Sequence, residues 1–95
     1  AEVELAWRRV IARHRIVKDS RIGYSIGIGY PPDWGEQTAS LRPGETTVLK
    51  PNMCFHCIPG IWQEGWGIEI SAPFVVGARG AERLAQFPED LIVKP

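Results

Sequence analysis

The sequence predicts an α+β fold in which an antiparallel sheet is backed by an amino-terminal helix. Within residues 2 to about 17, apolar side chains and one histidine recur at helical spacing along one stripe: Val3, Trp7, Val10, Ile11 and His14. After residue 45, short apolar runs rich in β-branched and aromatic residues alternate with glycine and proline. Short strands joined by tight turns favour antiparallel pairing, so one helix covering such a sheet is the simplest arrangement.

Each further element follows from the same patterns. The expected extended segments share apolar, aromatic or β-branched residues and lie at 24–30, 46–50, 53–62, 68–76 and 91–93. The third is broken near Pro59 and the fourth bends at Pro73, while Gly65 to Gly67 marks a reversal between them. Residues 80–86 suit one short helical turn. We expect His14 to pack on the apolar side of the first helix.

Length and composition describe one domain over residues 1–95. The chain is 44% apolar and 23% charged, and its eleven basic and eleven acidic residues cancel, which disfavours binding to nucleic acid or an anionic membrane. No apolar run approaches the length of about 20 residues that spans a bilayer, so we expect a cytoplasmic protein. The only methionine is Met53, and we expect the chain to be a piece of a longer protein.

A candidate site loop runs from Gly23 to Glu36 and concentrates glycine, aromatic and acidic residues where no regular element could use them all. Its glycines permit unusual backbone angles or a close approach to a ligand, and Pro31-Pro32 stiffens its exit. Trp34 stands beside Asp33 and Glu36. This composition predicts a binding or catalytic loop.

Residues 53–57 place one histidine between two cysteines, which raises the alternative of a small zinc-binding module. In a strand, Cys54 and His56 share one face and Cys57 points to the other, and His14 is the only further histidine. We therefore favour two buried free cysteines without a disulfide over a closed metal site. His56 is a candidate for proton transfer because a histidine gains and loses its proton near neutral pH.

Several residues together then carry a family resemblance. The segments Gly23-Tyr24-Ser25-Ile26-Gly27, Pro31-Pro32-Asp33-Trp34-Gly35-Glu36, Met53 to Trp62 and Gly67-Ile68-Glu69-Ile70-Ser71 resemble the creatinase/prolidase-like M24 family. Xaa-Pro peptidase-like and ectoine hydrolase-like members are the most similar. The resemblance implies the carboxy-terminal portion of a creatinase/aminopeptidase-like catalytic domain, half of a pita-bread fold.

The same resemblance implies a two-metal site held by two aspartates, one histidine and two glutamates in the peptidases. The aspartates would precede Ala1. Tyr24 stands where the ligand histidine would be and Ile58 where the first glutamate would be, while the second falls near Ser71 or Ala72, with Glu69 on a shifted register. We therefore expect no metal or other cofactor in this chain, and leave a divalent metal open for a full-length member.

The resemblance further implies hydrolysis of a C–N bond, of peptide or amidine type. The expected catalytic residues are His56, Glu36 and Glu69, and the expected substrate-binding residues are Tyr24, Tyr30 and Trp34. We expect a fragment that is inactive alone, with a small molecule or dipeptide as substrate of the parent protein. The alternatives are a non-catalytic, self-associating truncated module and the zinc module; we expect a homo-oligomer or association with the missing part.

Overall fold

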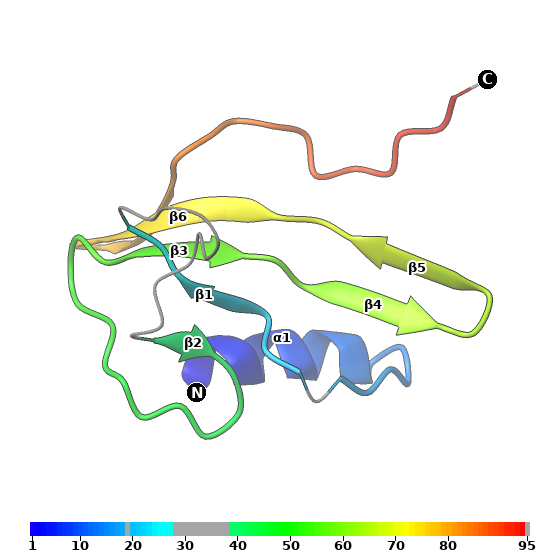
Figure 1. Ribbon diagram of the computed structural model, residues 1–95, viewed down its shortest axis with the longest axis horizontal. Helices are drawn as coiled ribbons and strands as arrows, with labels where there is room; N and C mark the ends of the chain where they lie inside the picture. Colours follow the sequence, from blue (N-terminus) through cyan, green and yellow to red (C-terminus); the bar gives the residue numbers. More distant parts are fainter. Residues whose placement is uncertain (19, 28–38, 95) are drawn as a thin grey trace.

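The computed structural model describes residues 1–18, 20–27 and 39–94 (Figure 1). The helix α1 spans Glu2–Ala12. The strands, in chain order, are β1 (Gly23–Ser25), β2 (Ser40–Leu41), β3 (Cys54–Cys57), β4 (Gly60–Gln63), β5 (Trp66–Glu69), β6 (Ala72–Gly77) and β7 (Gly80–Arg83). The arrangement is the α+β fold that the sequence predicts.

Five strands form one antiparallel sheet in the order β2-β1-β3-β6-β7, and β4 and β5 form a separate two-stranded ribbon. The ribbon prolongs the β3–β6 pair away from the sheet (Figure 1). Cys57 lies opposite Ala72 and Gly60 lies opposite Glu69, with two residues between them on each strand, so the register continues through the break. The predicted break near Pro59 is confirmed, whereas the interruption expected at Pro73 falls at residues 70–71, and Pro73 lies inside β6 opposite His56.

The core sits where β1, β2 and β3 meet. Phe55 is fully buried (0% exposed) and clusters with Ile22, Ala39 and Leu41. Its ring stacks on Phe74 of β6 with 5.6 Å between the centroids. Trp7 of α1 packs against this cluster, which fixes the helix beside β1 and β2 (Figure 1). Burial of a Phe side chain contributes about 1.5–3 kcal/mol, so Phe55 anchors the centre of the sheet.

The helix ends five residues earlier than predicted. Arg15 has a φ of 60°, which a right-handed helix cannot accommodate, and residues 13–15 form a turn. His14 is consequently exposed rather than packed. The predicted apolar stripe is only partly buried, because Ile11 is covered while Val10 is 50% exposed.

Three other expected elements are wrong. Residues 80–86 do not form a helical turn, because Gly80, with φ of 134°, closes a tight reversal after Gly77 that lets β7 pair with β6. Residues 46–50 are not a strand; this segment passes the start of α1, where the Ala1 amino group donates a hydrogen bond to the Glu45 carbonyl oxygen. Residues 91–93 are not a strand either, and their apolar side chains are exposed.

The described helix is too short and too polar to cross a membrane.

We predict that Gly23→Ala destabilises the sheet at the β1–β3 pair. An added Cβ would stand 2.6 Å from the His56 carbonyl oxygen and 2.8 Å from Leu41 Cδ1, so β1 must move away from β3. Overpacking of this kind costs about 1–3 kcal/mol of unfolding free energy, measurable by urea denaturation. The matched control is Gly44→Ala. Its added Cβ would have no atom within 4 Å, so this variant introduces the backbone strain of a φ of +76° without any clash. Only Gly23→Ala should shift the NMR signals of the His56 ring; unchanged His56 signals would contradict the prediction.

We predict that Arg8→Met destabilises the protein through Glu4. The Glu4 carboxylate is 2% exposed and accepts hydrogen bonds from Arg8 Nε at 3.0 Å and from an Arg8 terminal nitrogen at 2.8 and 2.9 Å. Removing the guanidinium leaves a buried acceptor without its partner, at a cost of about 1–3 kcal/mol. Urea denaturation measures the loss. Arg9→Met, at an exposed position, is the control, and an equal loss in both variants would refute a specific role for the pair.

Candidate functional site

The candidate site is built on a cross-strand pair in the middle of the sheet. Tyr24 of β1 lies directly opposite His56 of β3, a placement that brings the two side chains together on one face. Tyr24 Oη and His56 Nδ1 are 3.0 Å apart in a hydrogen bond. The two rings meet edge to face, with centroids 5.4 Å apart and an angle of 87°. Both side chains are half-buried.

This pair suits proton transfer because a phenol hydroxyl can donate or accept a hydrogen bond. When Nδ1 carries the proton it donates to Tyr24 Oη, and Nε2 of His56 is then a free base. When Nε2 carries the proton, the hydroxyl donates to Nδ1 instead. The bond therefore holds the imidazole in place in either tautomer, as the orienting group of a catalytic triad does.

Arg21 is the residue that the sequence reasoning missed. Its guanidinium carbon lies 4.9 Å from the centroid of the Tyr24 ring, within the range of a cation–π contact. The contact supports the face of the phenol and so helps to fix the hydroxyl that meets His56. Its signal in the sequence is weak, because a basic residue three positions before a tyrosine has no distinctive meaning.

Glu69 lies on the β4–β5 ribbon. It ends β5 opposite Gly60 and is exposed. Gly60 is four residues from His56, which corresponds to about 13 Å along an extended strand. The structure therefore does not bring Glu69 into contact with the histidine, and the two could act only on different parts of one ligand.

The register also shows where the expected metal-ligand positions fall. Because two residues separate the paired positions on each strand, Ile58 stands opposite Ser71. Ile58 also follows His56 by two residues, and its amide donates to the Ile22 carbonyl oxygen next to β1. The positions of Tyr24, Ile58 and Ser71, which the resemblance assigns to metal ligands, thus lie near one another. Their side chains are a phenol, an alkyl chain and a hydroxyl.

These residues do not fit a pair of divalent metals. The Tyr24 hydroxyl is engaged with His56, and Ile58 has no donor atom. Within residues 1–18, 20–27 and 39–94, no three histidine, cysteine, aspartate or glutamate side chains are placed to share an ion. The described residues offer neither the family's metal site nor the alternative zinc site.

The two cysteines are free, as expected, but half-buried rather than buried. The Cys54 thiol points to the Asn52 carbonyl oxygen at 3.9 Å. Burial, and secondarily the negative charge of Glu89, raise the pKa of the Cys57 thiol. Both causes disfavour the thiolate, so Cys57 is poorly suited to act as a nucleophile or a metal ligand.

Three of the expected site residues lie outside the described residues: Tyr30, Trp34 and Glu36. Their predicted roles are therefore not tested by the geometry.

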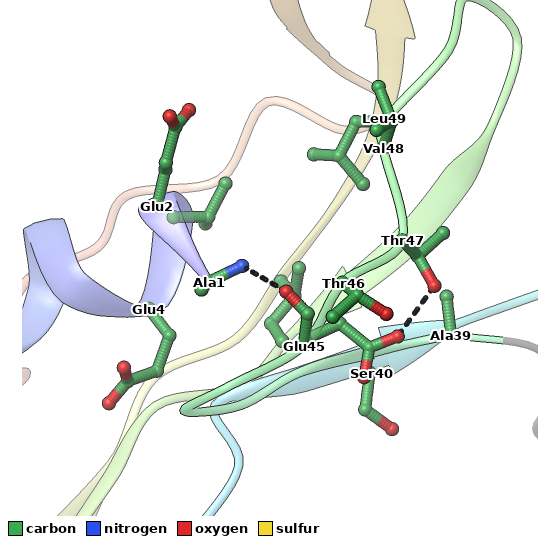
Figure 2. Close-up of a pocket in the computed structure, with 12 residues that line it drawn as sticks. Ala1, Glu2, Glu4, Ala39, Ser40, Glu45, Thr46, Thr47, Val48 and Leu49 are labelled. Carbon is green, nitrogen blue, oxygen red and sulfur yellow. Dashed lines mark hydrogen bonds between the residues drawn. The ribbon is translucent and has the colours of Figure 1, made fainter.

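A separate hollow of about 440 Å³ lies between the start of α1 and residues 39–49 (Figure 2). Ala1 and Thr47 each donate a hydrogen bond to Glu45, the first to its carbonyl oxygen and the second to its carboxylate. The Glu4 carboxylate at its margin is held by Arg8. Of the expected site residues that the structure describes, Tyr24, His56 and Glu69, none lines this hollow, which distinguishes it from the Tyr24–His56 site.

Comparison with known proteins finds relatives that are named as hydrolases. It is 50% identical over 92 residues to an uncharacterized hydrolase/peptidase, y4tM, of Sinorhizobium fredii, covering 97% of this chain and 24% of that protein. It is 55% identical over 75 residues to ectoine hydrolase of Halomonas elongata, covering 79% and 19%. The chain thus spans about a quarter or less of the length of these relatives.

The fold is also similar to that of a solved relative. The crystal structure of dipeptidase PepE from Mycobacterium ulcerans superposes with a TM-score of 0.84 at 29% identity, covering 97% of this chain and 24% of that one. The family model described as Metallopeptidase family M24 matches residues 1–78. The helix, the sheet and the Tyr24–His56 pair are therefore part of a pita-bread domain, and the chain belongs to metallopeptidase family M24.

Proposed function

We propose that this chain supplies the acid–base histidine of a hydrolase that cleaves a C–N bond. The observation that carries the proposal is the 3.0 Å hydrogen bond between Tyr24 Oη and His56 Nδ1. It joins a proton-exchanging ring to a fixed orienting group at the position where the resemblance places a metal ligand. Relatives named as an ectoine hydrolase, a hydrolase/peptidase and a dipeptidase support hydrolysis as the reaction class.

In the proposed step, Nε2 of His56 takes a proton from water while the water oxygen bonds to the substrate carbon. The imidazolium that forms donates from Nδ1 to Tyr24 Oη, which holds the ring. The C–N bond then breaks, and Nε2 returns the proton to the leaving nitrogen. One proton moves from water to nitrogen through a single histidine, which is general base and then general acid.

The remaining expected residues would bind the substrate. Glu69, with Glu36 from the undescribed segment, would hold a positive charge on the substrate, and Tyr24, Tyr30 and Trp34 would position it. This distribution favours a cationic small molecule or a dipeptide with its free amino group. An Xaa-Pro dipeptide and a small amidine both meet this description.

The proposal also assigns this chain only part of the active site. The chain covers about a quarter of the length of its relatives. The described residues supply the Tyr24–His56 pair but not the opposite side of an active-site cleft. We therefore propose that turnover requires the rest of the catalytic domain.

We predict that His56→Gln in the intact protein lowers kcat by about 10²–10⁴-fold, the usual contribution of a general acid–base group. KM should change little, because the imidazole moves protons rather than binding substrate. Turnover of ectoine and of dipeptides measures the effect. The matched control is His14→Gln, which alters an exposed histidine at the end of α1.

Tyr24→Phe refines the test, because it keeps the ring and removes only the hydroxyl that orients His56. We expect a loss in kcat that is smaller than for His56→Gln, with a pH–rate profile shifted relative to the unaltered protein. Unchanged turnover in His56→Gln would exclude the histidine from the mechanism.

A further inference from the structure

The segment after β7 carries a row of exposed apolar side chains. The large apolar residues of this segment are 53–85% exposed: Leu84, Phe87, Leu91, Ile92 and Val93. They belong to no helix or strand. Single apolar residues are common on protein surfaces, whereas a contiguous group of them marks an interaction site. Residues 87–93, here called the tail, also contain Glu89 and Asp90, so the tail offers an apolar surface with negative charge.

A clasp on β7 sets the place from which the tail leaves the sheet. Arg83 Nη2 donates a hydrogen bond to the Phe87 carbonyl oxygen at 2.9 Å and pairs with Glu89 Oε1 at 2.9 Å. β7 is the edge strand next to β6, and the tail runs beyond β6 while α1 lies beyond β1 and β2 (Figure 1). The sheet therefore separates the tail from the helix of its own chain. Among the described residues, Asp90 has no ion-pair partner.

The outward face of α1 has the complementary character. Ile11 is buried against the sheet, and the opposite side of the helix carries Leu5, Arg9 and Arg13 at four-residue spacing, with Val10 next to Arg9. Leu5 is 40% and Val10 is 50% exposed. In the part of the chain that the structure describes, neither arginine has an ion-pair partner. This face, here called the helix ridge, is apolar and positively charged.

The hollow beside the start of α1 matches the tail less well. Its lining includes Glu2, Glu4 and Glu45, whose negative charges repel the carboxylates of Glu89 and Asp90. Like charges that face each other across an interface suppress that pairing. Charge therefore favours the helix ridge over the hollow, although both surfaces are partly apolar.

We propose that the tail of one copy packs against the helix ridge of a second copy, and that the exchange is reciprocal. Both complementary surfaces belong to this chain, so a two-fold axis satisfies them together and forms the same contact twice. Asp90 pairs with Arg9 and Arg13, and the apolar side chains of residues 91–93 cover Leu5 and Val10. The inference goes beyond the proposed function, because neither surface contains the acid–base pair.

The test is complementation between two charge-reversed variants of the intact protein, measured by sedimentation equilibrium. The helix variant carries Arg9→Glu and Arg13→Glu, and the tail variant carries Asp90→Lys. Each variant alone sets like charges against each other at both contacts, which should raise the dimer dissociation constant by about tenfold or more. An equimolar mixture should regain the affinity of the unaltered protein, because each helix then meets a tail of opposite charge.

Recovery on mixing distinguishes a second copy from other occupants. If the tail packed on its own helix or on the rest of the catalytic domain, each chain in the mixture would keep its own mismatch, and mixing would restore nothing. Weakened association without recovery would therefore overturn the inference. Unchanged association in both variants, or an unaltered protein that is monomeric, would overturn it as well.

Matched controls change exposed residues outside both surfaces. Arg79→Glu lies in the turn between β6 and β7, and Glu64→Lys lies in the turn between β4 and β5. Neither should alter the dissociation constant. Ile92→Ser removes an apolar side chain that is 85% exposed and should weaken association by about fivefold. Val48→Ser, at 71% exposure but outside the tail and the helix ridge, should not; equal losses in these two variants would refute the assigned surface.

His56→Gln keeps this inference separate from the proposed function. The variant should associate as the unaltered protein does, whether or not it retains turnover. Retained turnover would refute the acid–base role and leave the exchange standing, whereas failed complementation would overturn the exchange and leave the acid–base role standing.

Discussion

The pairing of β1 with β3 is the constraint on which the site depends. Phe55 and His56 are neighbours on β3, and strand geometry turns their side chains to opposite faces. Phe55 is fully buried and stacked on Phe74, so it cannot rotate out of the core without a large cost. Its burial therefore fixes the direction of His56, and the register then sets Tyr24 beside it.

The close approach of the two strands requires Gly23. Its missing Cβ leaves room for the His56 carbonyl oxygen and for the side chain of Leu41 from β2. The glycine that begins β1 thus belongs to the packing of the sheet, and the tyrosine that follows it belongs to the site. Of these two adjacent residues, the first permits close packing of the strands and the second bonds to His56.

The replaced ligand positions give this part of the fold different side chains from those of a two-metal centre. A two-metal site concentrates negative charge and needs donors that converge on the ions. Here a phenol and an imidazole are hydrogen-bonded to each other, and the adjacent position is an isoleucine. The scaffold that would hold ligands in register instead holds a phenol and an imidazole in register, joined by a hydrogen bond.

Sequence patterns predicted the features that depend on local geometry. The helix, the strand around His56, the break at Pro59 and the reversal at Gly65 follow from periodicity and from residues that punctuate the chain. Glu4 was missed because a carboxylate is ordinarily exposed, although its spacing from Trp7 and Ile11 places it on the apolar stripe. Its ion pair with Arg8 offsets the cost of burying it. β7 was missed because a two-residue reversal at Gly80 is decided by the availability of β6 as a partner.

The pairing of Tyr24 with His56 was not predictable even though both residues were candidates. They are 32 positions apart, and their contact depends on a strand register that local patterns do not determine. Trp62 shows the reverse case. Its spacing from Gly60 in one strand, and that of Glu69 from Gly67 in the next, is visible in the sequence, but a two-residue spacing acquires meaning only when the strands are paired. Once Gly60 faces Glu69 and Gly67 faces Trp62, the absence of two side chains explains how the indole can lie flat with a carboxylate at its edge.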